Sequence, residues 1–222
     1  RFGALAAVDG VSIAFQPLGV HAVIGPNGAG KSTFLNLLSG ELRATSGAVR
    51  FRGKDVTRSP PNRISRLGIG RTYQTANVFA DLTCAECVWL AAHAHGRDGE
   101  AAAALGACGL GERAGKVAGD LSYGEQRQLE IGMILATGSE LLLLDEPLAG
   151  LGHDEAERIV ELLRRLAAGH TLVLVEHDMD AVFSIARTIT VMVDGRVLET
   201  GSAEQIRQSA AVREAYLGSE TP

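Results

Sequence analysis

A glycine-rich stretch between an apolar run and a helical segment places the strongest constraint on how this chain can fold. Residues 25–33 fit the pattern G-x-x-x-x-G-K-[ST], the apolar residues 20–24 precede them, and residues 34–38 have helical character. A strand, a glycine-rich loop and a helix in this order form a phosphate site, because glycines let backbone N–H groups turn toward the oxygens and the helix N-terminus adds positive potential. The candidate binding residues are Gly25, Pro26, Asn27, Gly28, Ala29, Gly30, Lys31, Ser32 and Thr33.

The side chains that follow the loop have different expected tasks. Lys31 is expected to reach the β- and γ-phosphates of a nucleotide, and the Ser32 hydroxyl to ligate Mg²⁺. A glycine-rich turn with a chance lysine is the alternative, and the flanking strand and helix argue against it.

Composition and charge restrict the function classes. The 222 residues suffice for a full core, and 46% hydrophobic with 21% charged residues is ordinary for a soluble globular protein. The net charge of -5, with acidic and basic residues mixed along the chain, does not suit a surface built for nucleic acid. No apolar stretch approaches the ~18 residues needed to cross a bilayer.

Two cysteines raise the question of a zinc site. Cys84 and Cys87 have His93 and His95 downstream, but structural zinc sites usually separate the two ligand pairs by about a dozen residues or more. A capping box at residues 83–86 predicts a helix that carries both thiols on one face. We therefore expect buried, reduced thiols and no zinc.

Apolar runs and helical patterns alternate along the chain. This predicts an α/β fold around a largely parallel sheet, with a helical insertion. The hairpin expected over 189–199 is indicated by the Asp-Gly pair between two β-prone runs. Expected strands are 11–24, 47–52, 141–144, 171–175, 189–193 and 196–199; expected helical segments are 72–120 with breaks, 124–136 and 154–168.

Two carboxylates end one buried strand. Asp145 and Glu146 follow four consecutive leucines, and ligands of an open α/β sheet bind outside the carboxyl ends of its strands. Asp145 could hold Mg²⁺ there, and Glu146 could orient and deprotonate a water that attacks the γ-phosphate. Alone, this pattern indicates only a strand end; an upstream phosphate loop gives it weight.

A third segment reads Leu-Ser-Tyr-Gly-Glu-Gln over residues 121–126. Ser122 and Gly124 at a helix start make a small anion site, although a serine N-cap alone would explain them equally well. Together with the phosphate loop and the Asp-Glu pair, in this order, the segment resembles the signature motif of ATP-binding cassette (ABC) proteins. The resemblance covers residues 1–222 as a single ABC ATPase domain.

The resemblance implies a fold and three further site residues. The fold is a P-loop NTPase (RecA-like) parallel-sheet core with an antiparallel β subdomain and a helical signature-motif subdomain at about residues 72–128. Gln74 matches the Q-loop glutamine, which contacts Mg²⁺ or the attacking water, and His177 matches the switch histidine at the γ-phosphate. Phe2 matches the aromatic residue that stacks on adenine.

In this family the site is shared between two subunits, each signature segment closing on the ATP of the other. The implied catalytic residues are Glu146, His177 and Gln74, with Ser32, Gln74 and Asp145 at the metal. Ser122 and Gly124 would act in trans. The departures from the family pattern include two in its motifs: Glu125 replaces the common glutamine, and Gly152 replaces the aspartate of the D-loop.

More narrowly, the chain is similar to ATPase subunits of importers for branched-chain amino acids, urea or amides. This implies ATP and Mg²⁺ as cofactors and a peripheral place at the cytoplasmic face of the inner membrane. The implied partners are a second ATPase subunit (identical or paralogous), two permease subunits and a periplasmic solute-binding protein, without nucleic acid.

Two other classes share parts of these motifs. ABC-type ATPases of DNA repair, chromosome maintenance or translation usually carry a long coiled coil or two cassettes, and this chain has a short intervening segment and one cassette. A small-molecule kinase or GTPase would leave the signature segment and His177 unexplained.

Overall fold

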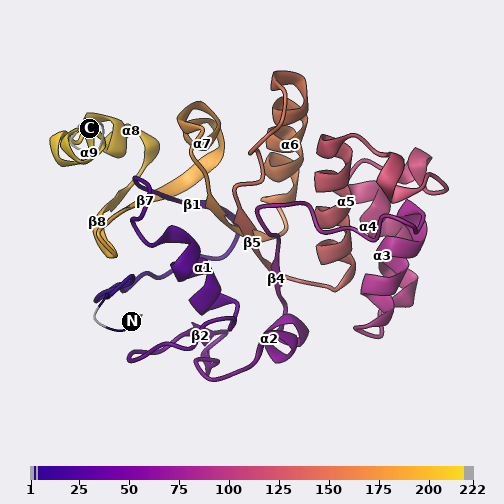
Figure 1. Ribbon diagram of the computed structural model, residues 1–222, viewed down its shortest axis with the longest axis horizontal. Coiled ribbons are helices and arrows are strands. Elements are labelled where there is room, and N and C mark those ends of the chain that lie inside the picture. Colours follow the sequence, from indigo (N-terminus) through magenta and orange to yellow (C-terminus); the bar gives the residue numbers. More distant parts are fainter. Residues whose placement is uncertain (1–2, 4, 218–222) are drawn as a thin grey trace.

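Short aliphatic runs form the centre of a six-stranded sheet in the computed structural model, which describes residues 3 and 5–217 (Figure 1). The order is β4-β5-β6-β1-β7-β8, and all neighbours pair in parallel except the last two. This confirms the predicted α/β fold. The strands are β1 (Gly19–Ile24), β4 (Ile69–Arg71), β5 (Leu141–Asp145), β6 (Thr171–Val175), β7 (Ala186–Val193) and β8 (Arg196–Gly201).

Helices cover both faces of the sheet because alternate residues of its central strands point to opposite sides. Leu143 packs with Phe34 and Ile64 on one side, whereas Leu142 packs with Ile159 on the other. Figure 1 shows the first side below the sheet and the second above it. The first side carries α1 (Lys31–Leu38) and α2 (Pro61–Leu67), and the second α6 (His153–Leu166) and α7 (Met179–Ile185).

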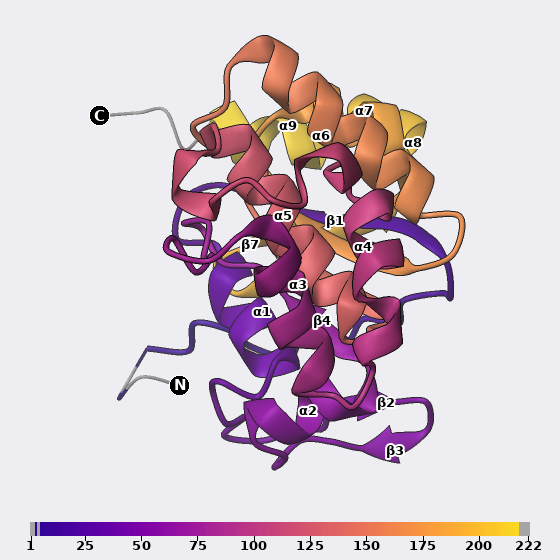
Figure 2. The same cartoon turned by 90° about the vertical axis from the view of Figure 1, so that its right-hand side faces the viewer.

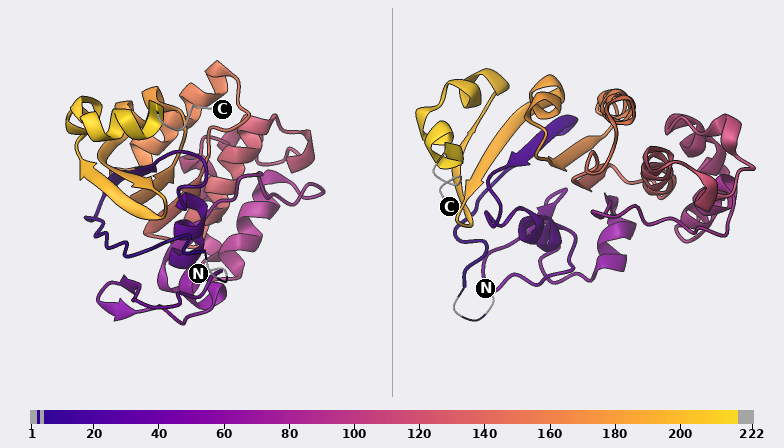
Figure 3. Two further views of the ribbon diagram at one scale, coloured as in Figure 1. Left: turned by 60° about the vertical axis from the view of Figure 1, so that its left-hand side comes forward. Right: turned by 45° about the horizontal axis from the view of Figure 1, so that its top comes forward.

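The hairpin edge of the sheet has its own small core. Val191 of β7 packs with Ile206 and Val212, which belong to α8 (Ala203–Gln208) and α9 (Ala210–Leu217). Both turn residues of the predicted hairpin, Asp194 and Gly195, have positive φ, as a two-residue hairpin turn requires. Figure 3 shows these helices lying against the two strands.

A group of helices lies beside the opposite part of the sheet (Figure 2). Its members are α3 (Cys84–His93), α4 (Ala101–Ala107) and α5 (Tyr123–Ala136), with 3-10 turns at Asp98–Glu100, Gly111–Arg113 and Ala118–Asp120. Capping boxes begin two of them: Thr83 with Glu86 at α3, and Ser122 with Glu125 at α5. The predicted capping box at residues 83–86 is thus confirmed.

Two local expectations were wrong, and a third holds only in part. Residues 11–18 form no strand; their alternate apolar residues, such as Val11 and Phe15, pack against the core without a ladder partner. Residues 72–83 form no helix, since the helix begins only at the Thr83 cap. Of the strand expected over 47–52, only Arg50–Phe51 (β2) is a strand, and it pairs with β3 (Lys54–Asp55) in an antiparallel hairpin.

The parallel order brings three segment ends to one edge of the sheet. The loop after β1 contains residues 25–30, β5 ends at Asp145, and the segment after β6 contains His177. Neighbouring parallel strands end at the same edge, where ligands of such folds bind. Across residues 3 and 5–217, none of the helices is long and apolar enough to cross a membrane.

Candidate active site

The phosphate loop, residues 25–30, has a backbone that only glycine permits at two positions. Gly25 and Gly30 have φ of 151° and 94°. A Cβ would collide with the carbonyl oxygen of Met192 at the first position and of Ala7 at the second. No side chain caps α1, and its first turn holds no acidic residue. The first N–H groups of α1 therefore point toward the loop without a competing anion.

Lys31 begins α1 beneath the loop and is buried. Its Nζ donates to the carbonyl oxygens of Gly25 at 2.7 Å and Pro26 at 3.0 Å. Burial lowers the pKa of Lys31, and the carboxylates of Glu146 and Asp145 oppose this shift. A cation held under the loop with two carboxylates nearby is suited to a charged phosphate–metal ligand.

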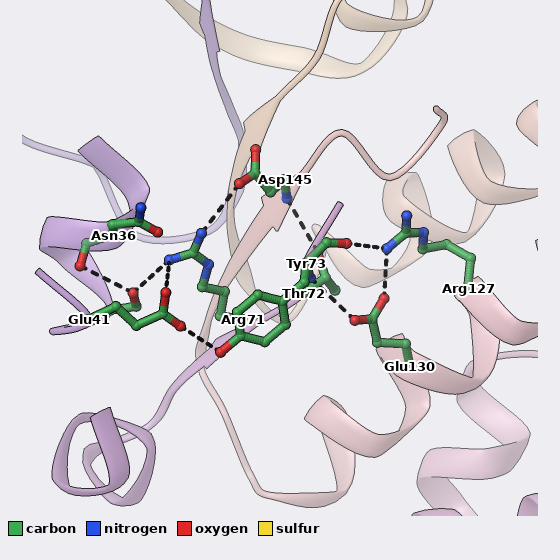
Figure 4. A network of polar contacts seen from close by, with 9 residues as sticks. Asn36, Glu41, Arg71, Thr72, Tyr73, Arg127, Glu130 and Asp145 are labelled. Carbon is green, nitrogen blue, oxygen red and sulfur yellow. Dashed lines mark hydrogen bonds and ion pairs between the residues drawn. The ribbon is translucent and has the colours of Figure 1, made fainter. Parts of the chain in front are cut away.

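Asp145 ends β5, and its two carboxylate oxygens have different surroundings. Oδ2 lies 3.3 Å from Nη2 of Arg71, at the end of β4 (Figure 4). Oδ1 is buried and has no hydrogen-bond partner among the described residues. Burial raises the pKa of Asp145, and the Arg71 guanidinium opposes the shift. A buried carboxylate oxygen without a partner fits a Mg²⁺ ligand, direct or through water.

Arg71 is held from several sides. Its Nη1 donates to Ser39 at 2.8 Å and to Glu41 at 3.1 Å. Its guanidinium also lies over the Tyr73 ring, 5.1 Å from the centroid, and the Tyr73 hydroxyl donates to Glu41 at 2.5 Å. These contacts fix the arginine against Asp145 and connect α1 with the end of β5.

Glu146 and His177 lie side by side at the sheet edge. The His177 Nε2 and the Glu146 Oε1 are 2.7 Å apart. Glu146 has φ of 49°, a conformation that costs about 1 kcal/mol or more in a non-glycine residue and that clusters at functional sites. Its N–H donates to Val175 O at 2.9 Å, which fixes the backbone from which the carboxylate projects.

The buried Glu176 orients the segments on either side of this pair. Its two oxygens accept the N–H groups of Leu148 at 2.7 Å and His177 at 2.9 Å. Burial raises the pKa of Glu176, and these backbone donors oppose the shift. One carboxylate therefore fixes both the segment after β5 and the backbone of His177.

Gln74 is exposed, and the segment around it has no regular secondary structure. Its carbonyl oxygen accepts from Arg127 Nη2 at 2.5 Å and from the Tyr123 hydroxyl at 3.4 Å. Both donors belong to α5, so the helix that follows the signature residues holds the backbone of Gln74.

The signature residues bond with α6. The Ser122 hydroxyl donates to Glu155 Oε1 at 2.8 Å, and the Gly124 N–H donates to the same oxygen at 3.3 Å. A Cβ at residue 124 would lie 2.9 Å from the Glu155 carboxyl carbon. The hydrogen bond from Ser122 lowers the pKa of Glu155. The two groups thus already bind an anionic oxygen.

The predicted site residues form two groups. Lys31, Asp145, Glu146 and His177 lie at the sheet edge, where both carboxylates act electrostatically on Lys31 and His177 contacts Glu146. Ser122 and Gly124 are instead joined to Glu155. Ser32 and Thr33 are half-buried in α1. Phe2, the predicted adenine-stacking residue, lies outside the described residues.

Sequence reasoning assigned no role to Arg71, Arg127, Glu155 or Glu176. A charged residue directly after the buried strand over 171–175 was the available signal for Glu176, whereas Arg71 ends a strand, β4, that was not expected. Glu155 resembles any acidic residue in the first turn of a helix, and Arg127 any solvent-facing arginine.

The cysteine and histidine residues considered for zinc have other partners. Cys84 and Cys87 are buried as free thiols. His93 pairs with Asp98 at 2.7 Å, and His95 with Ser65 at 2.9 Å. In the described part of the chain, no three His, Cys, Asp or Glu residues are grouped so that they could hold a metal ion.

Comparison with protein families and curated proteins gives consistent matches. Residues 8–149 match the ABC transporter family, and residues 196–221 match the branched-chain amino acid ATP-binding cassette transporter family. The chain is 38% identical to the high-affinity branched-chain amino acid transport ATP-binding protein BraF of Pseudomonas aeruginosa. It is 37% identical to LivG of Escherichia coli, a protein with the same description. Each match covers 98% of this chain and 94% of the relative.

Solved structures agree with the sequence matches. The chain is similar to an ATP-binding cassette of an ABC transporter in its ADP conformation, with a TM-score of 0.88 and 31% identity over 98% of this chain and 94% of the other. A nucleotide-free cassette gives a TM-score of 0.87 with 30% identity over 97% and 94% of the two chains. These relatives favour a transport ATPase over an ABC-type ATPase of DNA repair, chromosome maintenance or translation. The chain therefore belongs to the ABC transporter family, as a nucleotide-binding ATPase subunit that works with membrane components.

Proposed function

We propose that this chain powers the import of branched-chain amino acids. The observation that carries the proposal is the shared sheet edge, where Lys31, Asp145 and the Glu146–His177 pair meet. The choice of branched-chain amino acids as the solute is supported by relatives described as branched-chain amino acid transport proteins. The C-terminal match to the branched-chain amino acid family model adds to this support.

The residues around the loop are proposed to bind the nucleotide and its metal. Residues 25–33 surround the phosphates, and Lys31 donates to their oxygens once its ammonium leaves the loop carbonyls. Ser32 and Asp145 would hold Mg²⁺, which neutralises phosphate charge when bound. The buried Oδ1 of Asp145, which finds no hydrogen-bond partner in the described part of the chain, supports this assignment. Phe2 is proposed to stack on adenine.

Three side chains are proposed to act in hydrolysis. Glu146 accepts a proton from the attacking water, and its left-handed backbone directs the carboxylate to the edge of the sheet. His177 orients that carboxylate through their 2.7 Å contact and donates to the γ-phosphate. Gln74 positions the water or contacts the metal.

The site would be completed by a second ATPase subunit. Ser122 and Gly124 are proposed to bind the γ-phosphate of ATP held by that subunit, which is either an identical chain or a paralogue. Residues 72–128 would form the helical subdomain that transmits closure to two permease subunits. The complex would include a periplasmic solute-binding protein, with this chain at the cytoplasmic face of the inner membrane.

The experiment is ATP-driven uptake by the complete transporter in vesicles, with the binding protein supplied outside. We expect leucine uptake that requires ATP and Mg²⁺ on the side of the membrane where this chain lies. Uptake of urea or a short amide in place of leucine would contradict the solute assignment. ATP turnover without uptake of any of these solutes would contradict the importer role.

A further inference from the structure

A buried arginine on α5 grips the backbone next to Gln74. Arg127 is completely buried, although it lies only five residues after the signature serine. Its Nη1 donates to Tyr73 O and its Nη2 to Gln74 O, both at 2.5 Å. Figure 4 shows the guanidinium directed at the Tyr73 carbonyl. Successive carbonyl groups are thus bound by the two ends of one planar group.

Glu130 binds both Arg127 and the backbone of Tyr73. One of its oxygens pairs with Arg127 Nη1 at 2.8 Å, and the other accepts the Tyr73 N–H at 3.2 Å (Figure 4). Both polar groups of the Tyr73 backbone therefore bond to side chains of α5. The Tyr123 hydroxyl adds a contact of 3.4 Å to Gln74 O.

The energetics point to a geometric role for this pair. Removing two charges from water costs several kcal/mol per ion, and well-packed apolar residues often match or exceed the stability of a buried pair. A planar fork, however, presents its donors in one rigid geometry, whereas the ammonium of a lysine is a single rotatable group. The segment over residues 72–83 has no helix or strand of its own, and these bonds hold its backbone at Tyr73 and Gln74.

We propose that Arg127 is a positioning residue for Gln74: it ties the first turns of α5 to the Gln74 backbone, so that the glutamine and Ser122 move as one body. The proposal rests on the catalytic role of Gln74 and the trans role of Ser122 given above. In each subunit, closure of the signature on the partner's ATP would then be accompanied by movement of Gln74 toward that subunit's own nucleotide.

The main variant removes the hydrogen bonds from Arg127 to the Tyr73 and Gln74 carbonyl groups without leaving a buried charge. In Arg127→Met/Glu130→Gln the glutamine oxygen can still accept the Tyr73 N–H, but the two carbonyl contacts are lost. The matched control is Arg164→Met/Glu161→Gln, which removes an exposed pair with the same i,i+3 spacing on α6. We expect kcat for ATP hydrolysis to fall on the order of tenfold to a hundredfold. The affinity of the phosphate loop for ATP should stay unchanged. In the control variant, both kcat and the ATP affinity should equal those of the unmodified protein.

A double-mutant cycle distinguishes positioning from a general structural effect. In a Gln74→Ala background, Arg127→Met/Glu130→Gln should lower kcat no further, because there is no side chain left to position. An equal fall in both backgrounds would overturn the proposal. If the double variant does not fold, Arg127→Lys keeps the charge but not the fork, and it should show the same dependence on Gln74. Absence of turnover by the unmodified transporter would instead contradict the proposed function.

Discussion

The hydroxyl of Ser122 donates to Glu155 over 2.8 Å, and the Gly124 N–H donates to the same carboxylate oxygen. These are the two groups proposed to bind the γ-phosphate of the partner's ATP. Since Ser122 lowers the pKa of Glu155, the carboxylate is ionised at neutral pH and competes for the same donors. If Ser122 and Gly124 have this proposed role, the triphosphate must displace Glu155 before the two subunits can close.

Removing this competitor should ease closure. In a Glu146→Gln background, Glu155→Ala should lower the ATP concentration for half-maximal dimer formation by about threefold to tenfold, the range for an exposed charged hydrogen bond. Sedimentation or size-exclusion chromatography against ATP concentration measures this. The control is Glu157→Ala on the exposed side of α6. An unchanged or higher ATP requirement would show that Glu155 does not compete.

Replacement of the proposed base should separate binding from turnover. Glu146→Gln keeps the side-chain length and can still contact His177, but it cannot accept a proton. We expect ATP-dependent dimers with kcat reduced by on the order of 10² to 10⁴. Phosphate release and dimer formation are measured on the same sample, with Glu157→Gln as the control. Near-normal phosphate release would remove Glu146 from its proposed role.

Loss of the Asp145 charge should affect the metal before the nucleotide. Asp145→Asn keeps the shape of the side chain but removes the anionic oxygen. The Mg²⁺ concentration for half-maximal hydrolysis should rise about tenfold or more, while metal-free ATP binding should stay within about threefold. A Mg²⁺ titration of ATPase activity checks this, and Asp154→Asn is the exposed control. An unchanged Mg²⁺ requirement would refute the assignment.

The thiols should be inert in the folded chain. Burial raises the pKa of Cys108 to about 11 and also raises the pKa values of Cys84 and Cys87. A thiol-specific disulfide reagent at pH 8 should therefore react slowly until denaturant is added, when all 3 cysteines react. Stoichiometric zinc in the purified protein would contradict this expectation.

The same shift predicts how stability depends on pH. Because the folded pKa of Cys108 lies above its ordinary value of 9.0, the unfolded chain ionises first as pH rises. The contribution of the Cys108 thiol to the free energy of unfolding is therefore complete below about pH 9. This contribution is lost as the pH rises toward about 11. Cys108→Ala, compared with the unmodified chain in urea titrations across this range, should lack that component. An identical pH dependence would contradict it.

Short runs of apolar residues predicted the central strands, which are buried on both faces of the sheet. The strand over 171–175 has the predicted ends, and the strand predicted over 141–144 extends one residue further, to Asp145. The same signals failed over residues 11–18, because Val11 and Phe15 are apolar for packing against the core and not for pairing in a sheet. Alternating apolar residues therefore indicate that one side of a segment is buried. A β-strand requires, in addition, a neighbouring strand with which to form hydrogen bonds.

The unpredicted contacts to Gln74 and Ser122 are long-range. Arg127 reaches Gln74 across 53 residues, and Glu155 reaches Ser122 across 33. Neither contact leaves a local pattern, because each depends on how α5 and α6 lie relative to their neighbours. Motif spacing could place Lys31 and Asp145 at one sheet edge, but not the side chains that hold the motifs in position.

The position of Glu176 has a consequence for communication within the protein. Its carboxylate accepts N–H groups from both Leu148 and His177, so two loops share a single buried anchor. If docking of another subunit displaces residues 148–152, the histidine backbone must shift too or lose its bond to Glu176. Contact at the subunit boundary would thereby be sensed where the terminal phosphate is cleaved.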